Sequence, residues 1–245
     1  MIITIANQKG GVGKSTTAFN LGSALNRGGK KILLIDLDSQ TDLSTSLGIS
    51  ENIEYTINDI FKGKSIKNII TKLENGLHII PASKELTGTQ MSLKKGDVLV
   101  WALEDVRSRY EYIIIDTAPS MSILNVNALI ASQMVIIALE PEYLALRGLR
   151  DFLNTIKLLD DKFNVKSPII KILITKYDQR KILHREVSES IKKHFKDNLL
   201  KTKIRTCVKL AEAPSHFKDI FDYAPSSHAS EDYNQLSKEI LREVK

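Results

Sequence analysis

Cysteine, long hydrophobic runs and repeated segments are nearly absent from this sequence, and each absence excludes a class of protein. The single cysteine, Cys207, excludes a disulfide framework and any metal site that needs several thiolates, and it favours a reducing compartment. No run approaches the roughly 18 apolar residues of a membrane span. Residues 1–5 lack the positive charge with which a signal peptide begins. We therefore expect a cytoplasmic protein that does not enter a membrane.

What remains is the composition of an ordinary globular protein. The chain has 245 residues, of which 42% are hydrophobic and 26% are charged. This length can bury a large core, and these fractions exclude a disordered or fibrous chain. No stretch rich in Pro, Gly or Ser divides the sequence. We expect residues 1–245 to form a single domain.

Short apolar runs alternate with helical patterns along most of the chain. Runs of Ile, Val and Leu without polar alternation are typical of strands buried in a parallel sheet. The alternation therefore predicts an α/β fold with a doubly wound, mainly parallel sheet and helices on both faces. Trp101 is expected to pack its helix against this sheet. The predicted strands are 2–6, 31–37, 77–81, 112–116, 134–139, 169–175 and a short edge strand at 203–207, and the predicted helices are 15–26, 97–109, 122–131, 144–160, 182–196 and 230–244.

A glycine-rich loop follows the first predicted strand and opens the first helix. Its residues are Lys9, Gly10, Gly11, Val12, Gly13, Lys14, Ser15 and Thr16. Glycines let backbone N–H groups turn around a phosphate, and a helix N-terminus adds unpaired donors. Lys14 can place its charge on the β- and γ-phosphates, and the Ser15 hydroxyl can ligate Mg²⁺. The loop therefore predicts a site for ATP and Mg²⁺.

This loop departs from the usual phosphate-binding pattern because it carries a second lysine, Lys9, where the standard motif needs none. Lys9 cannot easily reach the phosphates that Lys14 occupies, but it could reach a neighbour's nucleotide across a dimer interface. The segment resembles the deviant Walker A motif of the ParA/MinD superfamily of P-loop ATPases. That resemblance implies an ATP-bound sandwich homodimer in which Lys9 acts on the partner's nucleotide.

Three aspartates end two of the other predicted strands. Asp36 and Asp38 close residues 31–37, and Asp116 closes residues 112–116. Carboxylates at the carboxyl edge of the sheet, beside the phosphate loop, suit Mg²⁺ binding and the positioning of an attacking water. The first pair resembles the Walker A′ motif, with Ser39 in place of its usual proline, which implies that Asp38 orients the hydrolytic water. Asp116 fits a Walker B aspartate, and Thr117–Pro119 fits a switch that senses the γ-phosphate.

The resemblance extends over nearly the whole chain. Residues 141–149 are similar to the family's E-Y-x-A-L-x-G-L segment, which implies that Glu142 lies near the partner's nucleotide, although Arg147 stands where an acid is common. Residues 174–180 are similar to its T-x-Y-D-x-R stretch. Residues 208–216 look like the V-R-L-S-E-A-P-S-H block of Soj-like ParA proteins, which implies that Pro214 contacts the adenine. Because the first strand begins at residue 2, the resemblance implies the short ParA type, without an N-terminal helix-turn-helix domain.

Positive charge is concentrated in one part of the chain. Residues 162–209 hold fourteen Lys and Arg against four Asp and Glu, whereas the rest of the chain is close to neutral. Such a segment is either the footprint of a polyanion or a solvated lysine-rich surface. The candidate phosphate contacts are Lys192, Lys193, Lys196, Lys201, Lys203, Arg205 and Lys209, with Arg242 and Lys245 as further candidates.

Together these features predict a DNA-partitioning ATPase. The expected cycle has an ATP-bound dimer that binds non-specific DNA on the nucleoid and is released when a ParB-like partner stimulates hydrolysis. Two alternatives stay open: a MinD-like ATPase that cycles on membranes, and a relative that positions a protein cargo. A membrane role would require the amphipathic C-terminal helix to lie in a bilayer interface.

Overall fold

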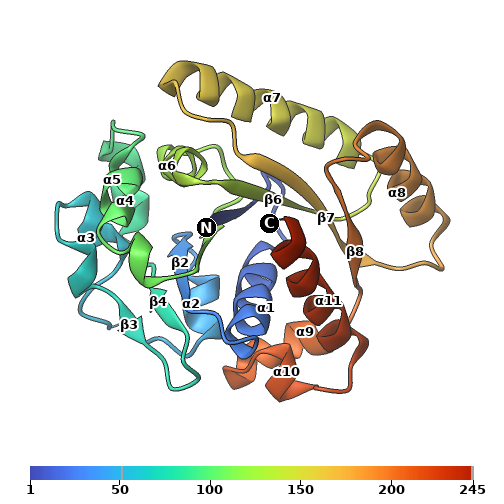
Figure 1. Ribbon diagram of the computed structural model, residues 1–245, viewed down its shortest axis with the longest axis horizontal. Helices are drawn as coiled ribbons and strands as arrows, with labels where there is room; N and C mark the ends of the chain where they lie inside the picture. Colours follow the sequence, from blue (N-terminus) through green and yellow to red (C-terminus); the bar gives the residue numbers. More distant parts are fainter. Residues whose placement is uncertain (51, 244–245) are drawn as a thin grey trace.

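The computed structural model describes residues 1–50 and 52–243, and its centre is an eight-stranded sheet (Figure 1). The strand order is β3-β4-β2-β5-β1-β6-β7-β8, and the neighbouring strands are parallel except for the antiparallel pair β3 and β4. The sequence therefore predicted the fold class correctly. The strands are β1 (Ile2–Ala6), β2 (Ile32–Leu37), β3 (Thr71–Lys72), β4 (His78–Ile80), β5 (Tyr112–Thr117), β6 (Met134–Leu139), β7 (Ile169–Tyr177) and β8 (Leu199–Arg205).

Helices cover both faces of this sheet (Figure 1). Their bounds are α1 (Lys14–Arg27), α2 (Asp42–Ser46), α3 (Ile57–Phe61), α4 (Leu86–Ser92), α5 (Val98–Glu104), α6 (Ile123–Ala131), α7 (Ala145–Phe163), α8 (Ile182–His194), α9 (Lys209–Glu212), α10 (Ile220–Tyr223) and α11 (His228–Glu243). Residues 66–68, 107–109 and 213–216 form 3₁₀ turns. The helices α1 and α11 pack on one face, and α3, α5, α6, α7 and α8 pack on the other.

Alternation along the central strands decides which helix each side chain meets. Leu34 and Ile114 pack in the cluster that contains α1 and α11, whereas Leu33 and Ile113 pack against α3, α5 and α6. Side chains of a strand point alternately to the two faces, so a strand that is buried on both faces is apolar throughout. The helix α1 comes so close to the sheet that a Cβ on Gly22 would lie 2.7 Å from the Leu34 side chain.

Trp101 does not pack against the sheet as the sequence suggested. Its side chain is 71% exposed, and its indole N–H donates to Asp97 at 3.3 Å. The helix α5 instead buries Leu99 and Leu103, which lie one turn apart on the opposite side of the helix. The prediction was wrong because Leu99 and Leu103 occupy the inner side of α5, which turns Trp101 toward solvent.

The outer edge of β8 is closed by carboxylates of α11. Glu239 accepts the backbone N–H groups of Lys201 at 2.6 Å and Thr202 at 2.9 Å. Asp232 accepts the N–H of Arg205 at 2.9 Å. Backbone donors that a next strand would otherwise use are therefore already bonded, since β8 is the last strand of the sheet.

The apolar face of α11 is turned into the molecule. Tyr233, Leu236 and Ile240 are at most 1% exposed, and they pack in the cluster that contains α1 and β8. Leu241 packs against the same cluster. The amphipathic pattern of this helix is therefore used for packing within the chain. In the described part of the chain, no helix is long and apolar enough to cross a membrane.

Candidate nucleotide-binding site

A cleft of about 1040 Å³ opens at the carboxyl ends of the parallel strands. One wall is the glycine-rich loop with the start of α1, and a second wall is the segment from Asp38 to Ser46. A third wall comes from β8 and the turns that follow it, up to Lys218. Ligands of doubly wound sheets bind at this edge, outside the carboxyl ends of the strands.

The loop between β1 and α1 has the conformation that its glycines permit. Gly11 and Gly13 have φ angles of 71° and 86°, in the left-handed region, and α1 begins at Lys14. The Thr175 hydroxyl at the end of β7 donates to the Val12 carbonyl at 2.7 Å, which fixes the loop against the sheet. The first N–H groups of α1 and the helix dipole therefore face the cleft, as an anion site requires.

Lys14 is almost completely buried beneath this loop. The residue is 6% exposed, and its Nζ lies 3.4 Å from the Lys9 carbonyl oxygen. Burial lowers the pKa of Lys14, while the negative charges of Asp116 and Asp38 oppose that shift. The Lys14 ammonium group makes a long hydrogen bond to the Lys9 carbonyl and has further N–H donors. A bound phosphate could accept hydrogen bonds from these donors.

The second lysine of the loop points the other way, to the rim of the cleft. Lys9 Nζ contacts Glu142 Oε2 at 2.6 Å and Glu140 Oε2 at 3.9 Å, and its side chain is 48% exposed. The hydrogen bond from Lys9 holds the pKa of Glu142 below its usual range. Glu142 does not line the cleft. In the single chain, Glu142 therefore binds the chain's own Lys9, and the expected contact with a partner's nucleotide stays a prediction.

Asp36 and Asp38 lie at the end of β2 but have different surroundings. Asp36 is fully buried and accepts the Ser44 N–H at 2.9 Å, the Ser44 hydroxyl at 2.7 Å and the Asp38 N–H at 3.1 Å. Burial raises the pKa of Asp36 to about 6. Asp38 lines the cleft, and one of its oxygens accepts the Gln40 N–H at 3.0 Å. Asp36 therefore orders the segment that presents Asp38, whose other oxygen is available to a water molecule.

Asp116 lies at the centre of the strand ends, and no described residue forms a hydrogen bond of normal geometry with either of its buried carboxylate oxygens. Its pKa is raised well above the usual value, first by burial and then by repulsion from Asp36, while the nearby Ser15 hydroxyl and Lys14 oppose the shift. A buried carboxylate without a hydrogen-bond partner is stabilised when it binds a cation. Oxygen donors from Asp116, Asp36, Asp38 and Ser15 are the kind that Mg²⁺ prefers, so these residues fit the expected ion.

Comparison with known proteins agrees with this geometry. The model of a family described as AAA domain matches residues 1–172. The sporulation initiation inhibitor protein Soj of Bacillus subtilis is 43% identical, over 98% of this chain and 97% of that protein. The chromosome-partitioning ATPase Soj of Thermus thermophilus is 36% identical, over 99% of this chain and 96% of its own length. This chain belongs to the Soj/ParA family of P-loop ATPases.

Solved structures show the same fold with nucleotide bound. A putative plasmid partition protein of Borrelia burgdorferi, bound to AMPPNP, is 29% identical with a TM-score of 0.84, over 99% of this chain and 98% of that chain. Cobyrinic acid a,c-diamide synthase of Mycobacterium smegmatis, with a bound ATP analog and magnesium, is 28% identical with a TM-score of 0.85, over 98% and 94% of the two chains. In the Soj/ParA protein described here, the glycine-rich loop lies at the head of α1.

The far wall of the cleft contains the segment that resembles the Soj-like block. Pro214 lines the cleft together with Cys207, Val208 and Ala211, and its expected contact with the adenine stays a prediction. The sequence did not indicate Tyr233, which reaches the cleft from α11, with its hydroxyl 3.3 Å from the Thr17 hydroxyl. No local motif could reveal Tyr233, because 216 residues separate it from Thr17.

Lys176 is a second cleft residue that sequence reasoning missed. Its φ of 49° is in the left-handed region, which residues other than glycine rarely adopt. Its carbonyl accepts the Thr206 hydroxyl at 2.8 Å, and its Nζ lies 4.0 Å from Glu140. The signal was present in the T-x-Y-D-x-R stretch, but nothing in that pattern says that the residue after Thr175 faces the cleft.

The predicted DNA contacts divide into lysines without ion partners and residues already engaged within the chain. Arg205 forms ion pairs with Asp232 at 2.6 Å and Glu231 at 3.0 Å, and these carboxylates raise its pKa. Lys209 pairs with Glu212 at 2.8 Å, and Lys203 lies over the Tyr177 ring at 4.1 Å. Among the described residues, Lys192, Lys193, Lys196 and Lys201 are exposed and form no ion pair. Lys245 lies outside the described residues.

Proposed function

We propose that this protein is a partition ATPase whose ATP-bound homodimer binds DNA without sequence preference on the nucleoid. A ParB-like partner stimulates ATP hydrolysis, and the dimer then separates and leaves the DNA. ATP is the substrate of the cleft and Mg²⁺ its cofactor. Residues 1–245 act as one ATPase domain in the cytoplasm. The observation that carries this proposal is the pair of lysines on one loop, with Lys14 buried beneath it and Lys9 held at the rim.

Each cleft residue has a defined task in hydrolysis. The loop N–H groups and Lys14 bind the phosphates, and the orphaned Asp116 binds the cation with help from Ser15 and Asp38. When bound, Mg²⁺ neutralises charge that develops on the phosphate oxygens. Asp38 orients the attacking water with its carboxylate oxygen that faces the cleft. Hydrolysis is slow in the single chain because Lys9 is engaged by Glu142 and cannot reach its own nucleotide.

Exposed apolar side chains support the proposed dimer interface. Tyr143 is 82% exposed and Leu144 is 64% exposed, and both directly follow Glu142 at the rim of the cleft. Large apolar side chains beside a polar site are typical of surfaces that another chain covers. A second copy that meets this rim would bring its nucleotide within reach of Lys9.

The lysines on α8 and β8 support the proposed DNA surface. Lys192 and Lys193 lie in the last turn of α8, Lys196 follows it, and Lys201 lies on β8. The helix and the strand are connected by residues 195–198 and lie on the same side of the molecule (Figure 1), so these four lysines belong to one part of its surface. Exposed lysines without ion partners can bind backbone phosphates, and such contacts carry no sequence information.

The deciding experiment measures binding of Asp38→Ala protein to random duplex DNA with ATP, with ADP and without nucleotide, over a salt series. Removing the carboxylate that orients water should leave nucleotide binding intact and keep the dimer in its ATP state. We expect DNA binding with ATP alone, falling steeply as salt rises. Binding that does not depend on nucleotide would contradict the proposed cycle.

A matched pair of triple variants tests the DNA surface in the same background. Lys192→Ala/Lys193→Ala/Lys196→Ala removes three lysines from each chain and so six from the dimer. It should weaken binding and lower the salt slope by up to about five, since each lost phosphate contact contributes about 0.9 to that slope. The control Lys94→Ala/Lys95→Ala/Lys157→Ala removes three exposed lysines elsewhere and should bind as the parent does. Equal losses in both triple variants would show a general charge effect and overturn the assignment of the surface.

The membrane alternative is disfavoured by α11, whose apolar residues are buried against α1 and β8. Co-sedimentation with anionic vesicles and ATP tests it directly, and we expect the protein to stay in the supernatant. A protein cargo is the remaining alternative. If DNA binding fails in every nucleotide state while ATP still binds, a protein cargo becomes the better explanation and the ATPase assignment stands.

A further inference from the structure

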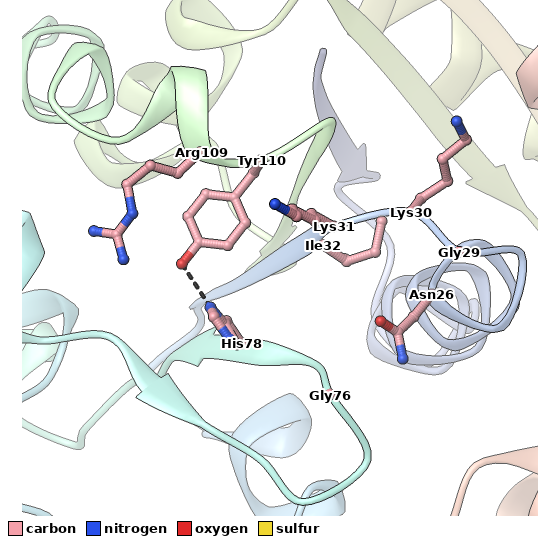
Figure 2. Close-up of a pocket in the computed structure, with 9 residues that line it drawn as sticks. All are labelled: Asn26, Gly29, Lys30, Lys31, Ile32, Gly76, His78, Arg109 and Tyr110. Atoms are coloured by element: carbon pink, nitrogen blue, oxygen red, sulfur yellow. Dashed lines mark hydrogen bonds between the residues drawn. The ribbon is translucent and has the colours of Figure 1, made fainter.

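A second cavity lies at the opposite edge of the sheet from the nucleotide cleft. It has a volume of about 510 Å³ and lies where β2 and β4 begin, beside the residues that precede β5. Figure 2 shows the Tyr110 ring between Arg109 on one side and Lys31 on the other, with its hydroxyl directed at His78. Gly29 and Gly76 form part of the lining, and their φ angles of 81° and 85° mark two tight turns without side chains.

The cations around this cavity outnumber the carboxylates available to them. Lys30 extends away from Tyr110 and pairs with Glu111 at 2.8 Å, and the other oxygen of Glu111 accepts the Lys31 N–H at 3.1 Å. Among the described residues, neither the Lys31 ammonium nor the Arg109 guanidinium forms an ion pair. Lys72 stands opposite His78 in the strand pair and has no ion pair there either.

The cavity also holds an ordered pair of polar rings. His78 Nδ1 lies 2.7 Å from the Tyr110 hydroxyl, and the two rings meet edge to face. With the phenol donating to Nδ1, the neutral imidazole carries its proton on Nε2 and can donate to an anion. Burial lowers the pKa of His78, and the charges of Lys72 and Arg109 lower it further, which reflects the positive surroundings.

The C-terminal end of α1 lies at the rim of this cavity. Free carbonyl groups there would repel an anion, but most of them are hydrogen-bonded. The Gly28 N–H bonds the Ala24 carbonyl at 3.1 Å, and the Lys30 N–H bonds the Leu25 carbonyl at 3.1 Å. The Gly29 N–H bonds the Asn26 carbonyl at 2.9 Å as well, so three of the last carbonyls of the helix are satisfied within the turn. The unpaired Lys31 and Arg109 side chains then determine the sign of charge that the cavity prefers.

We infer that this cavity binds a phosphate group through the positive charge of Lys31 and Arg109, which line it on either side of Tyr110, and through a hydrogen bond from His78. Pockets of a few hundred Å³ take small organic ligands, so a phosphorylated small molecule fits the volume. A phosphate of a DNA backbone has the same chemistry and is the second possible source. The site is separate from the nucleotide cleft, and its existence does not depend on the proposed partition function.

The test follows the His78 imidazole by NMR in the full chain, with the nucleotide cleft filled by saturating Mg–ADP. His78→Gln identifies the resonance, since the sequence holds five histidines. The pKa of His78 is measured with added inorganic phosphate, with ribose 5-phosphate and with a short random duplex, each against chloride at equal ionic strength. A bound phosphate favours the charged imidazolium, so we expect the pKa of His78 to rise.

Paired variants decide whether the named cations hold the anion. Lys31→Ala/Arg109→Ala should lose the phosphate-dependent rise in the pKa of His78, while Lys94→Ala/Lys157→Ala should keep it. Both pairs remove two exposed or partly exposed cations, so net charge is matched. A rise with ribose 5-phosphate or inorganic phosphate indicates a free phosphate ligand, and a rise with the duplex alone indicates a backbone phosphate. No rise beyond the chloride control, or a rise that persists in Lys31→Ala/Arg109→Ala, would overturn the site.

Discussion

Lys9 and Lys14 stand five residues apart on one loop, and at the residue scale the fold gives them opposite environments. Lys14 is buried among carboxylates and can serve only a ligand inside the cleft. Lys9 is half exposed and bound to Glu142, so it can move outward at little cost. Exposed ion pairs of this kind contribute about 0–1 kcal/mol. The chemistry of the loop therefore depends on how readily one surface pair opens.

Replacing Glu142 should make that opening easier. In Glu142→Gln, Lys9 loses its ion partner, so ATP-dependent dimerisation should tighten by up to about fivefold for each kcal/mol released. Analytical ultracentrifugation with ATP measures this, and Lys9→Ala is the companion variant that should dimerise poorly while it still binds ATP. A weaker dimer in Glu142→Gln would instead show that Glu142 contributes contacts of its own to the interface.

The buried aspartates predict the pH dependence of stability in the nucleotide-free protein. The pKa of Asp36 is about 6 in the folded chain and about 3.9 in an unfolded chain, so the folded state holds the extra proton between these values. The contribution of Asp36 to stability is therefore largest below about pH 4. It falls as the pH rises from about 4 to about 6, by about 3 kcal/mol in total. Asp116 acts in the same direction.

Denaturant unfolding between pH 5 and pH 7.5, without Mg²⁺ or nucleotide, measures this slope. Asp116→Asn removes one titrating group and should flatten it, whereas Asp161→Asn, on the exposed side of α7, should leave it unchanged. Stability that rises with pH over this window in the parent protein would contradict the raised pKa values of Asp36 and Asp116.

At the scale of elements, the sheet could be predicted from sequence and much of its surroundings could not. The central strands are continuous apolar runs, and only a strand buried on both faces has that pattern. The two-residue β3 and the four- or five-residue helices α2, α3, α9 and α10 are too short to show a period. The predicted edge strand at 203–207 lies at Leu199–Arg205, because β8 alternates buried and exposed residues and has no apolar run to mark its start.

The candidate site divides in the same way. Loop residues 9–16 and the strand-end aspartates are local patterns. Most of the loop residues and Asp38 line the cleft, and the roles assigned to them stay predictions. Tyr233 and Lys176 reach the cleft through the packing of distant elements, which no short pattern contains.

The close contact between α1 and β2 gives a prediction at this scale. Gly22→Ala would place a Cβ 2.7 Å from the Leu34 side chain, so overpacking should cost about 1–3 kcal/mol, against a gain of about 1 kcal/mol in helix propensity. Gly88→Ala, in α4, meets nothing within 4 Å and should be neutral or stabilising. Unfolding free energies of the two variants provide the comparison, and a Gly22→Ala protein as stable as Gly88→Ala would mean that α1 can move away from the sheet.

At the scale of the whole molecule, we expect bound nucleotide to contribute a large share of the free energy of unfolding. Mg–ADP at about 100 times its dissociation constant adds about 2.7 kcal/mol, which for a chain of this size corresponds to a rise in Tm of about 5–10 °C. Lys14→Ala should lose this rise, and Asp38→Ala should keep most of it, because Lys14 still binds the phosphates and Asp116 and Ser15 still hold the cation. Differential scanning fluorimetry distinguishes them, and a full rise in Lys14→Ala would remove Lys14 from the phosphate site.

Both edges of the sheet offer little to a further strand. The β3 end is two residues long, and the β8 end has backbone donors bonded to Glu239 and Asp232 of α11. Sheet edges with free donors are where chains add to one another as extended β-structure. We therefore expect any polymer of this protein to join its subunits through helices, loops and side chains. The cross-β spacing near 4.8 Å should be missing from its diffraction.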